Sequence, residues 1–102
     1  PTMPASETFD FDRAEDDTGD GEYATAAIIV DVREIARVRF EIWDGRSDDV
    51  WLTILRNGVT TRLLVTDPEA WATAIVADGD SVTVEARVSR GNRIKGILEL
   101  LE

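Results

Sequence analysis

The chain contains no cysteine and no histidine among its 102 residues. These absences exclude a disulfide framework, the usual nitrogen and sulfur ligands of zinc or haem, a thiolate nucleophile and an imidazole base. Most hydrolase and redox mechanisms need one of these groups, and no serine or lysine stands in a recognisable nucleophile motif. We therefore expect a protein that is not an enzyme and that uses no cofactor.

Long apolar runs are also missing. No segment approaches the roughly 20 apolar residues of a membrane span, and no basic-then-apolar pattern at the start indicates a signal peptide. The expectation is a cytoplasmic protein without a membrane partner.

Lysine is nearly absent, because ten of the eleven basic residues are arginine and Lys95 is the exception. Against them stand 21 acidic residues, giving a net charge of -10. This composition resembles that of proteins from salt-loving archaea, although a GC-rich bacterial or phage genome also suppresses lysine. The distinction matters because at 1 M salt the Debye length is ~3 Å, so net negative charge then repels nucleic acid only weakly.

Most of the negative charge lies in residues 1–22, which hold eight acidic residues and Arg13 as the single base. Their sizeable apolar side chains are Met3, Phe9 and Phe11. So little apolar surface does not offset the entropy of ordering the chain, which predicts a disordered acidic tail. The folded domain is then residues 23–102, with a nearly balanced charge of -3.

The strongest local signal is a hairpin. Residues 50–56 and 59–66 are rich in β-branched and aromatic side chains and flank Asn57-Gly58, the favoured pair for a type I′ turn. This turn predicts that Arg56 faces Val59 and that Leu52 faces Leu63, with an apolar set on one side of the sheet.

After this hairpin, the sequence predicts a short helix at about residues 68–78. Asp67 is a suitable N-cap, Pro68 suits the first helical position, and Gly79 follows the end. Alternating residues 82–88 and 94–101 then predict a closing hairpin with its turn at residues 90–92, and Gly96 predicts a bulge. Upstream, residues 24–43 form either two strands or one long bent strand.

The order of five to six strands with one helix indicates an all-β domain, and it resembles the oligonucleotide/oligosaccharide-binding (OB) barrel. The resemblance covers residues 24–101. It includes the segments IWDGR (42–46) leading into VWLTI (50–54), and ADGDSVTV (77–84) followed by RGNR (90–93). An extra strand at the Asn57-Gly58 hairpin departs from this pattern, so other six-stranded small barrels remain alternatives.

The side of the sheet that faces away from the core gathers aromatic and basic residues, which suits stacking on bases and contact with phosphates. The residues are Arg37, Arg39, Trp43, Trp51, Arg62 and Arg87. A structural alternative is that the indoles cover a barrel end and the arginines balance nearby acids. A second basic group, Arg90, Arg93 and Lys95, surrounds the closing turn, where cations also serve to protect sheet edges.

Two acidic segments invite a metal-binding interpretation, and neither supports a metal site. Residues 16–21 begin like a calcium loop, but the position that needs a bidentate glutamate is Ala27. Asp44, Asp48 and Asp49 lie beside Gly45 and Ser47, a composition typical of turns.

The leading hypothesis is a non-catalytic OB-like module that binds single-stranded DNA or RNA, or belongs to a complex that does. The alternative is a protein-interaction module or inhibitor whose acidic residues 1–22 mimic nucleic acid and dock on a basic partner. A third hypothesis is a structural subunit whose edge strands pair with another chain.

Overall fold

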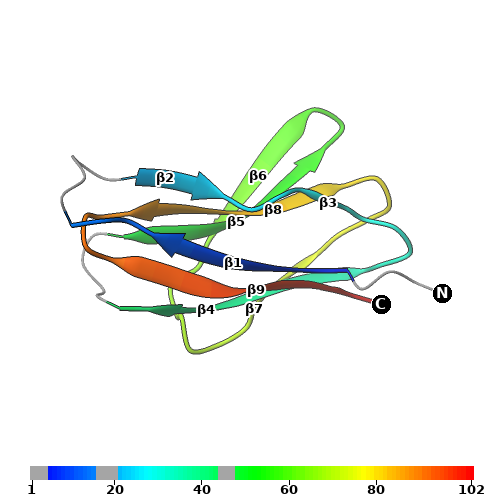
Figure 1. Cartoon of the computed structure of the whole chain (residues 1–102). Coiled ribbons are helices and arrows are strands. Elements are labelled where there is room, and N and C mark those ends of the chain that lie inside the picture. The colour runs from blue at the N-terminus through cyan, green and yellow to red at the C-terminus, as the bar shows by residue number, and fades with distance from the viewer. Residues whose placement is uncertain (1–4, 16–20, 44–47) are drawn as a thin grey trace.

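The chain folds as two antiparallel β-sheets packed face to face (Figure 1). The computed structural model describes residues 5–15, 21–43 and 48–102. One sheet has the strand order β1-β9-β4-β7, and the other has the order β2-β8-β5-β6, with β3 also pairing with β8. Within the described residues the strands are β1 (Ser6–Asp12), β2 (Gly21–Ala24), β3 (Ile28–Ile29), β4 (Ile35–Ile42), β5 (Asp49–Arg56), β6 (Val59–Leu64), β7 (Ala72–Ile75), β8 (Ser81–Val88) and β9 (Arg93–Leu101).

The hydrophobic core lies between the two sheets and follows the period of two expected for strands. In β8 the alternate residues Val82, Val84, Ala86 and Val88 are buried. Their counterparts in the other sheet include Ala36, Val38 and Phe40 of β4 and Ile94, Leu98 and Leu100 of β9. The all-β prediction is confirmed, but the sheets do not close into a barrel.

The predicted hairpin is confirmed in register and turn chemistry. Arg56 pairs with Val59, and Leu52 pairs with Leu63. Asn57 and Gly58 have φ angles of 51° and 78°, as a type I′ turn requires.

The predicted helix at 68–78 is wrong. Asp67 does accept a hydrogen bond from the amide of Glu69, as a cap would, but the chain then turns and forms β7 along β4. In this extended conformation Ala72, Ala74 and Val76 face the core, while Ile75 is 84% exposed. Strand pairing with β4 and burial of alternate side chains therefore outweigh the local signals for the start of a helix.

The closing strands also differ from the prediction. β8 pairs with β5 and β9 pairs with β4, so the turn at residues 90–92 carries the chain from one sheet to the other instead of closing a hairpin. Gly96 forms no bulge, because its register with β1 and β4 is continuous. A Cβ there would lie 2.2 Å from the carbonyl oxygen of Arg39, which explains the glycine as a close backbone approach.

Part of the predicted disordered tail is a strand in the structure. β1 pairs with β9 along its whole length, and Phe9 and Phe11 are each 7% exposed. Phe11 stacks on Tyr23 of β2 with ring centroids 5.4 Å apart, which joins the edges of the two sheets. These two phenylalanines bury enough apolar surface to order β1, although residues 1–22 as a whole contain few apolar side chains.

Between residues 24 and 43 the structure agrees with the two-strand alternative and not with one long bent strand. β2, the short β3 and the eight-residue β4 divide the segment, and β4 crosses into the other sheet.

Candidate binding surfaces

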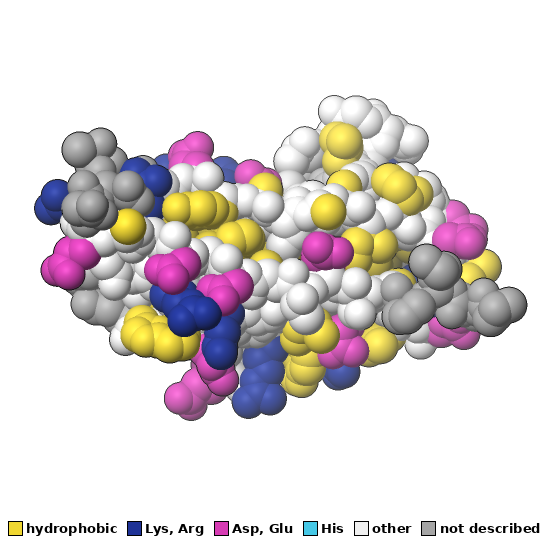
Figure 2. All heavy atoms as spheres, in the orientation of Figure 1, with side chains coloured by type: hydrophobic (Ala, Val, Ile, Leu, Met, Phe, Trp, Pro, Cys, Tyr) yellow, Lys and Arg dark blue, Asp and Glu magenta, His cyan; other side chains and the backbone are white. Residues whose placement is uncertain are grey.

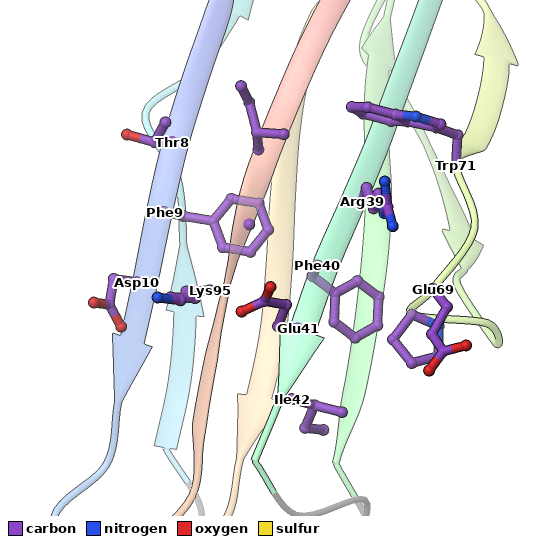
Figure 3. Close-up of a pocket in the computed structure, with 13 residues that line it drawn as sticks. Thr8, Phe9, Asp10, Arg39, Phe40, Glu41, Ile42, Glu69, Trp71 and Lys95 are labelled. Atoms are coloured by element: carbon purple, nitrogen blue, oxygen red, sulfur yellow. The ribbon is translucent and has the colours of Figure 1, made fainter.

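The first candidate surface is the outer face of the β1-β9-β4-β7 sheet, here called the Trp43 face. Alternate residues of three strands point away from the core and form cross-strand rows. Asp10, Lys95 and Glu41 make one row, which is visible in Figure 3, and Thr8, Ile97 and Arg39 make the next.

Trp43 follows β4 at one end of this face and is 59% exposed. Its ring lies 5.1 Å from the Arg93 guanidinium carbon and 5.7 Å from the Lys95 ammonium nitrogen. Arg93 also donates two hydrogen bonds to Asp10, at 2.8 and 2.5 Å. These hydrogen bonds lower the pKa of Asp10 and raise that of Arg93, so Arg93 is already engaged by a carboxylate.

Trp71 lies on the same face, although the sequence placed it on a helix. The Arg37 guanidinium stacks 3.8 Å from its ring and also contacts Glu99 at 3.3 Å. Trp71, Arg39 and Lys95 line an open groove of about 1240 Å³, together with Glu41 and Glu69 (Figure 3). No local sequence pattern identifies Trp71 as part of this surface, because its position depends on β7 pairing with β4.

The Trp43 face is balanced in charge rather than basic. Its bases Arg37, Arg39, Arg93 and Lys95 are matched by Asp10, Asp12, Glu41 and Glu99. In Figure 2 basic and acidic side chains lie next to each other on the visible face. Among the described residues, Arg39 and Lys95 are the bases of this face that form no ion pair.

The second candidate surface surrounds Trp51 on the outer face of the other sheet. The Arg62 guanidinium lies 4.1 Å from the ring centroid of Trp51, and that of Arg87 lies 6.0 Å away. Arg62 contacts Glu85 at 3.8 Å, and Arg87 contacts Glu22 at 3.7 Å. The half-buried indole is therefore covered by cations that carboxylates hold in place.

The structure does not bring the predicted site residues together on one surface. Trp43, Arg37, Arg39, Arg93 and Lys95 belong to one sheet, whereas Trp51, Arg62 and Arg87 belong to the other. Arg90 lies in the exposed turn between β8 and β9. Because the outer faces of a two-layer sandwich point in opposite directions, the two indoles do not form one stacking platform.

The third candidate surface is the free edge of β6. The sequence suggested edge strands that pair with another chain but did not identify which strand. Every residue of β6 is exposed, and within the described residues β5 is its one strand partner. The hairpin stands out from the sandwich (Figure 1). Large apolar side chains are exposed on it: Leu55 43%, Val59 65%, Leu63 40% and Leu64 47%. The adjacent Leu63 and Leu64 could have indicated this surface from the sequence, because two consecutive apolar residues place apolar groups on both faces of one strand.

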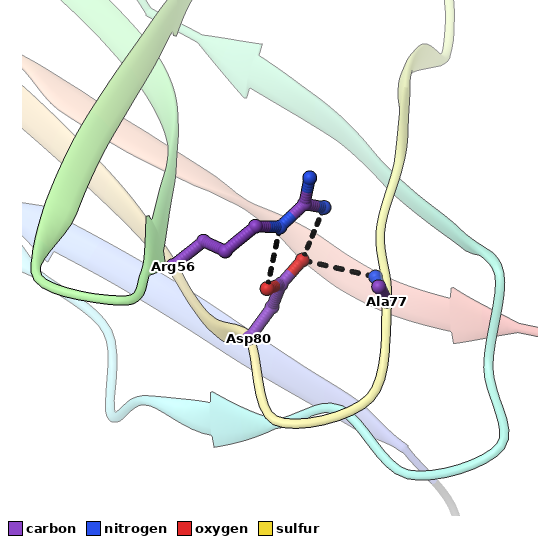
Figure 4. A network of polar contacts seen from close by, with 3 residues as sticks. All are labelled: Arg56, Ala77 and Asp80. Carbon is purple, nitrogen blue, oxygen red and sulfur yellow. Dashed lines mark hydrogen bonds and ion pairs between the residues drawn. The ribbon is translucent and has the colours of Figure 1, made fainter.

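Arg56, the last residue of β5 before the Asn57-Gly58 turn, anchors the turn end of this hairpin to the sandwich. Its guanidinium donates to both carboxylate oxygens of Asp80, at 2.9 and 2.7 Å (Figure 4). The amide of Ala77 donates to the same carboxylate at 2.9 Å. The turn end of the hairpin is therefore held against the loop that precedes β8.

The acidic segments show no metal centre in the part of the chain that the structure describes. The calcium-like segment 16–21 and Asp44 fall largely outside that part. Asp48 accepts hydrogen bonds from the amide and hydroxyl of Ser89 and from the side chain of buried Asn92, so it serves the turn between the sheets. None of the described segments is a helix long and apolar enough to cross a membrane.

Comparisons with known proteins give no match for this chain among family models, curated proteins or solved structures. The surfaces described above are therefore interpreted from their own chemistry.

Proposed function

We propose that this chain is a non-catalytic binding module that recognises an extended polypeptide by adding it as a strand to the free edge of β6. The observation that carries this proposal is that every residue of β6 is exposed, on a projecting hairpin with apolar side chains at its surface. Strand addition of this kind combines main-chain hydrogen bonds with contacts from alternate side chains.

The hydrogen-bond pattern of the hairpin supports an available edge. The amide of Val65 donates to the carbonyl of Val50, so this pair is hydrogen-bonded. In an antiparallel ladder such pairs alternate with non-hydrogen-bonded ones, and the β6 residues of the latter point their main-chain groups away from β5. With the register of this hairpin, those residues are Thr60, Arg62 and Leu64.

β6 also lacks most of the devices that normally protect an edge strand. Proline, bulges, several charges or a covering loop usually prevent pairing with another chain. β6 has no proline, its register with β5 is continuous, and Arg62 is its one charged residue. An unprotected edge with exposed apolar side chains is typical of an interaction surface.

A proline at position 60 tests this proposal. Thr60→Pro removes an amide that points away from β5, so the hairpin keeps its own ladder. Thr60→Val is the matched control, because it changes the side chain at the same position and keeps the amide. We expect peptides selected from a displayed random library on the unaltered chain to bind Thr60→Val as they bind that chain, and to bind Thr60→Pro at least tenfold more weakly. Equal binding to all three proteins contradicts the proposal, and so does the absence of any selectable peptide when the chain is monomeric under the same conditions.

A second candidate function, single-stranded nucleic-acid binding, is favoured by one observation. Trp43 is exposed beside Lys95, and the nearby groove adds Trp71 and Arg39. This function predicts that an oligonucleotide quenches tryptophan fluorescence and that Trp43→Ala weakens the binding. Unchanged fluorescence at both low and ~1 M salt, where the Debye length differs severalfold, contradicts it.

A further inference from the structure

We infer that the strand which adds to β6 is β6 of a second copy of this chain, running antiparallel with Thr61 at the two-fold axis. This inference rests on the proposed function and names its partner. It rests on the order of side chains along β6, on the direction of its free main-chain groups and on the charge of the hairpin.

Two-fold symmetry restricts the possible registers. In a sheet that continues across a two-fold axis, directly opposite residues lie on the same face. Side chains alternate between faces, so a residue pairs with one at an even separation from itself. The axis therefore passes through a residue of β6, and Thr61 and Arg62 are the two central choices.

An axis at Thr61 pairs side chains of the same kind. On the core-side face, Val59 lies opposite Leu63 of the second copy, and Thr61 lies opposite itself. On the outer face Thr60 lies opposite Arg62. Val59 and Leu63 are 65% and 40% exposed in the single chain, so the pairing covers apolar surface that water otherwise contacts.

This register also pairs the free main-chain groups of Thr60 and Arg62, two of the three β6 residues that direct such groups away from β5. Thr60 and Arg62 both direct their amide and carbonyl away from β5. Placed opposite each other, they exchange two hydrogen bonds, and symmetry doubles that number. Thr61 then forms the non-hydrogen-bonded pair at the axis, where side chains are closest.

An axis at Arg62 is less favourable for electrostatic reasons. It places the two Arg62 guanidinium groups directly opposite each other, and like charges in that position destabilise a strand pair. It also pairs Thr60 with the apolar Leu64.

The charge of the hairpin suits self-association in an otherwise acidic chain. Residues 50–66 contain Arg56 and Arg62 but no Asp or Glu, whereas the whole chain has a net charge of -10. Contact through this segment therefore keeps carboxylates of the two copies apart. The remaining repulsion between them is long-range, so the dimer is expected to strengthen as salt shortens the Debye length. The hairpin stands out from the two sheets (Figure 1), and among the described residues β6 has no strand on the side away from β5.

The absence of cysteine from the chain makes a direct test possible, because a single introduced cysteine forms disulfides only between molecules. We expect Thr61→Cys to form a covalent dimer rapidly under mild oxidation, since opposite residues have Cβ atoms about 4.5–5.5 Å apart. Thr60→Cys and Arg62→Cys are the matched controls. In the proposed register each lies diagonally from its own copy at about 7–8 Å, and both should cross-link at least tenfold more slowly.

Sedimentation of the unaltered full chain provides the second measurement. We expect reversible dimers whose fraction rises with protein concentration and salt, and we expect Thr60→Pro to be monomeric under the same conditions. Faster cross-linking of Arg62→Cys than of Thr61→Cys overturns the register. A monomer at all concentrations, with no preferred cross-link, overturns the inference itself. In that case, peptide binding that is weakened by Thr60→Pro would still support the addition of a strand from a different chain. Failure of the dimer and failure of the proposed function are therefore distinguishable.

Discussion

At the residue scale, the most instructive group is the buried carboxylate of Asp80. Its side chain is 2% exposed, yet it receives hydrogen bonds from Arg56 and from the amide of Ala77. A buried charge persists only when it is paired and hydrogen-bonded in this way. The hydrogen bonds from Arg56 are the main cause of the lowered pKa of Asp80, and they outweigh the opposing effect of burial.

The lowered pKa makes the contribution of Asp80 to stability dependent on pH. Because the folded pKa lies below the unfolded value of about 3.9, the contribution is complete above that value and is lost as pH falls through the folded pKa. We predict that Asp80→Asn lowers the urea midpoint near pH 7 and that the difference from the unaltered chain shrinks at acidic pH. Urea titrations at pH 7 and pH 3 measure this difference. A difference that stays constant between the two pH values contradicts the assigned ion pair.

The sequence predicted that tryptophans and cations lie together on one outer face, and the structure divides them between two sheets. The sequence interpretation placed cations beside tryptophans, and cations do lie near Trp43 and Trp51. It missed the pair between Asp10 and Arg93, because the two residues are far apart in the chain and meet only when β1 joins β9. Composition also treated Asp10 as part of a free polyanion, whereas the structure places it in an ion pair.

At the scale of elements, local turn chemistry made the hairpin at residues 50–66 predictable. Asn57-Gly58 fixes the turn, and the turn fixes the register of β5 and β6 without reference to the rest of the chain. The segment that forms β7 was not predictable by the same means. Asp67 does accept a hydrogen bond from the amide of Glu69, as a helix cap would. The conformation of the residues that follow is nevertheless determined by pairing with β4, which is distant in the sequence.

β1 shows the opposite error, in which composition concealed an element. Phe9 and Phe11 alternate with exposed acidic residues and lie in the core. This alternation is the signature of a half-buried strand, but the negative charge of residues 1–22 outweighed it in the sequence interpretation. Asp10 and Asp12 of β1 are exposed to solvent, where their charges cost little.

We predict that Phe9→Ala destabilises the fold by about 3–5 kcal/mol, as expected for removal of a buried aromatic side chain. Thr8→Ala, at the exposed neighbouring position, is the control and should change stability by less than about 0.5 kcal/mol. Urea unfolding followed by tryptophan fluorescence measures both. If neither variant changes the midpoint, β1 is not part of the stable sheet.

At the scale of the whole molecule, the division into two layers determines which surfaces are available. The crossing from β8 to β9 carries the chain between sheets, and it separates Trp51 from Trp43. The sequence favoured one curved sheet closed into a barrel, since strand patterns alone do not specify which strands pair. The core positions were largely predictable from alternation, whereas the layering depends on long-range pairs such as β1 with β9.

The layered arrangement leaves the projecting edge of β6 as the central feature of the functional account. Two faces carry tryptophans that are already contacted by cations, and the Trp43 face is balanced in charge. The edge of β6, by contrast, offers main-chain groups and apolar side chains that no described residue covers. This contrast is the basis of the proposed function in strand pairing.

Amide hydrogen exchange, measured residue by residue at low and high protein concentration, tests this account most directly. With strand pairing at β6, the amides of Thr60 and Arg62 are expected to exchange freely in dilute solution and to become protected as concentration rises. The amides of Thr61 and Leu63 point toward β5 and should be protected throughout. Exchange at Thr60 and Arg62 that stays equally fast at every concentration, in the presence of ~1 M salt, would contradict pairing at this edge.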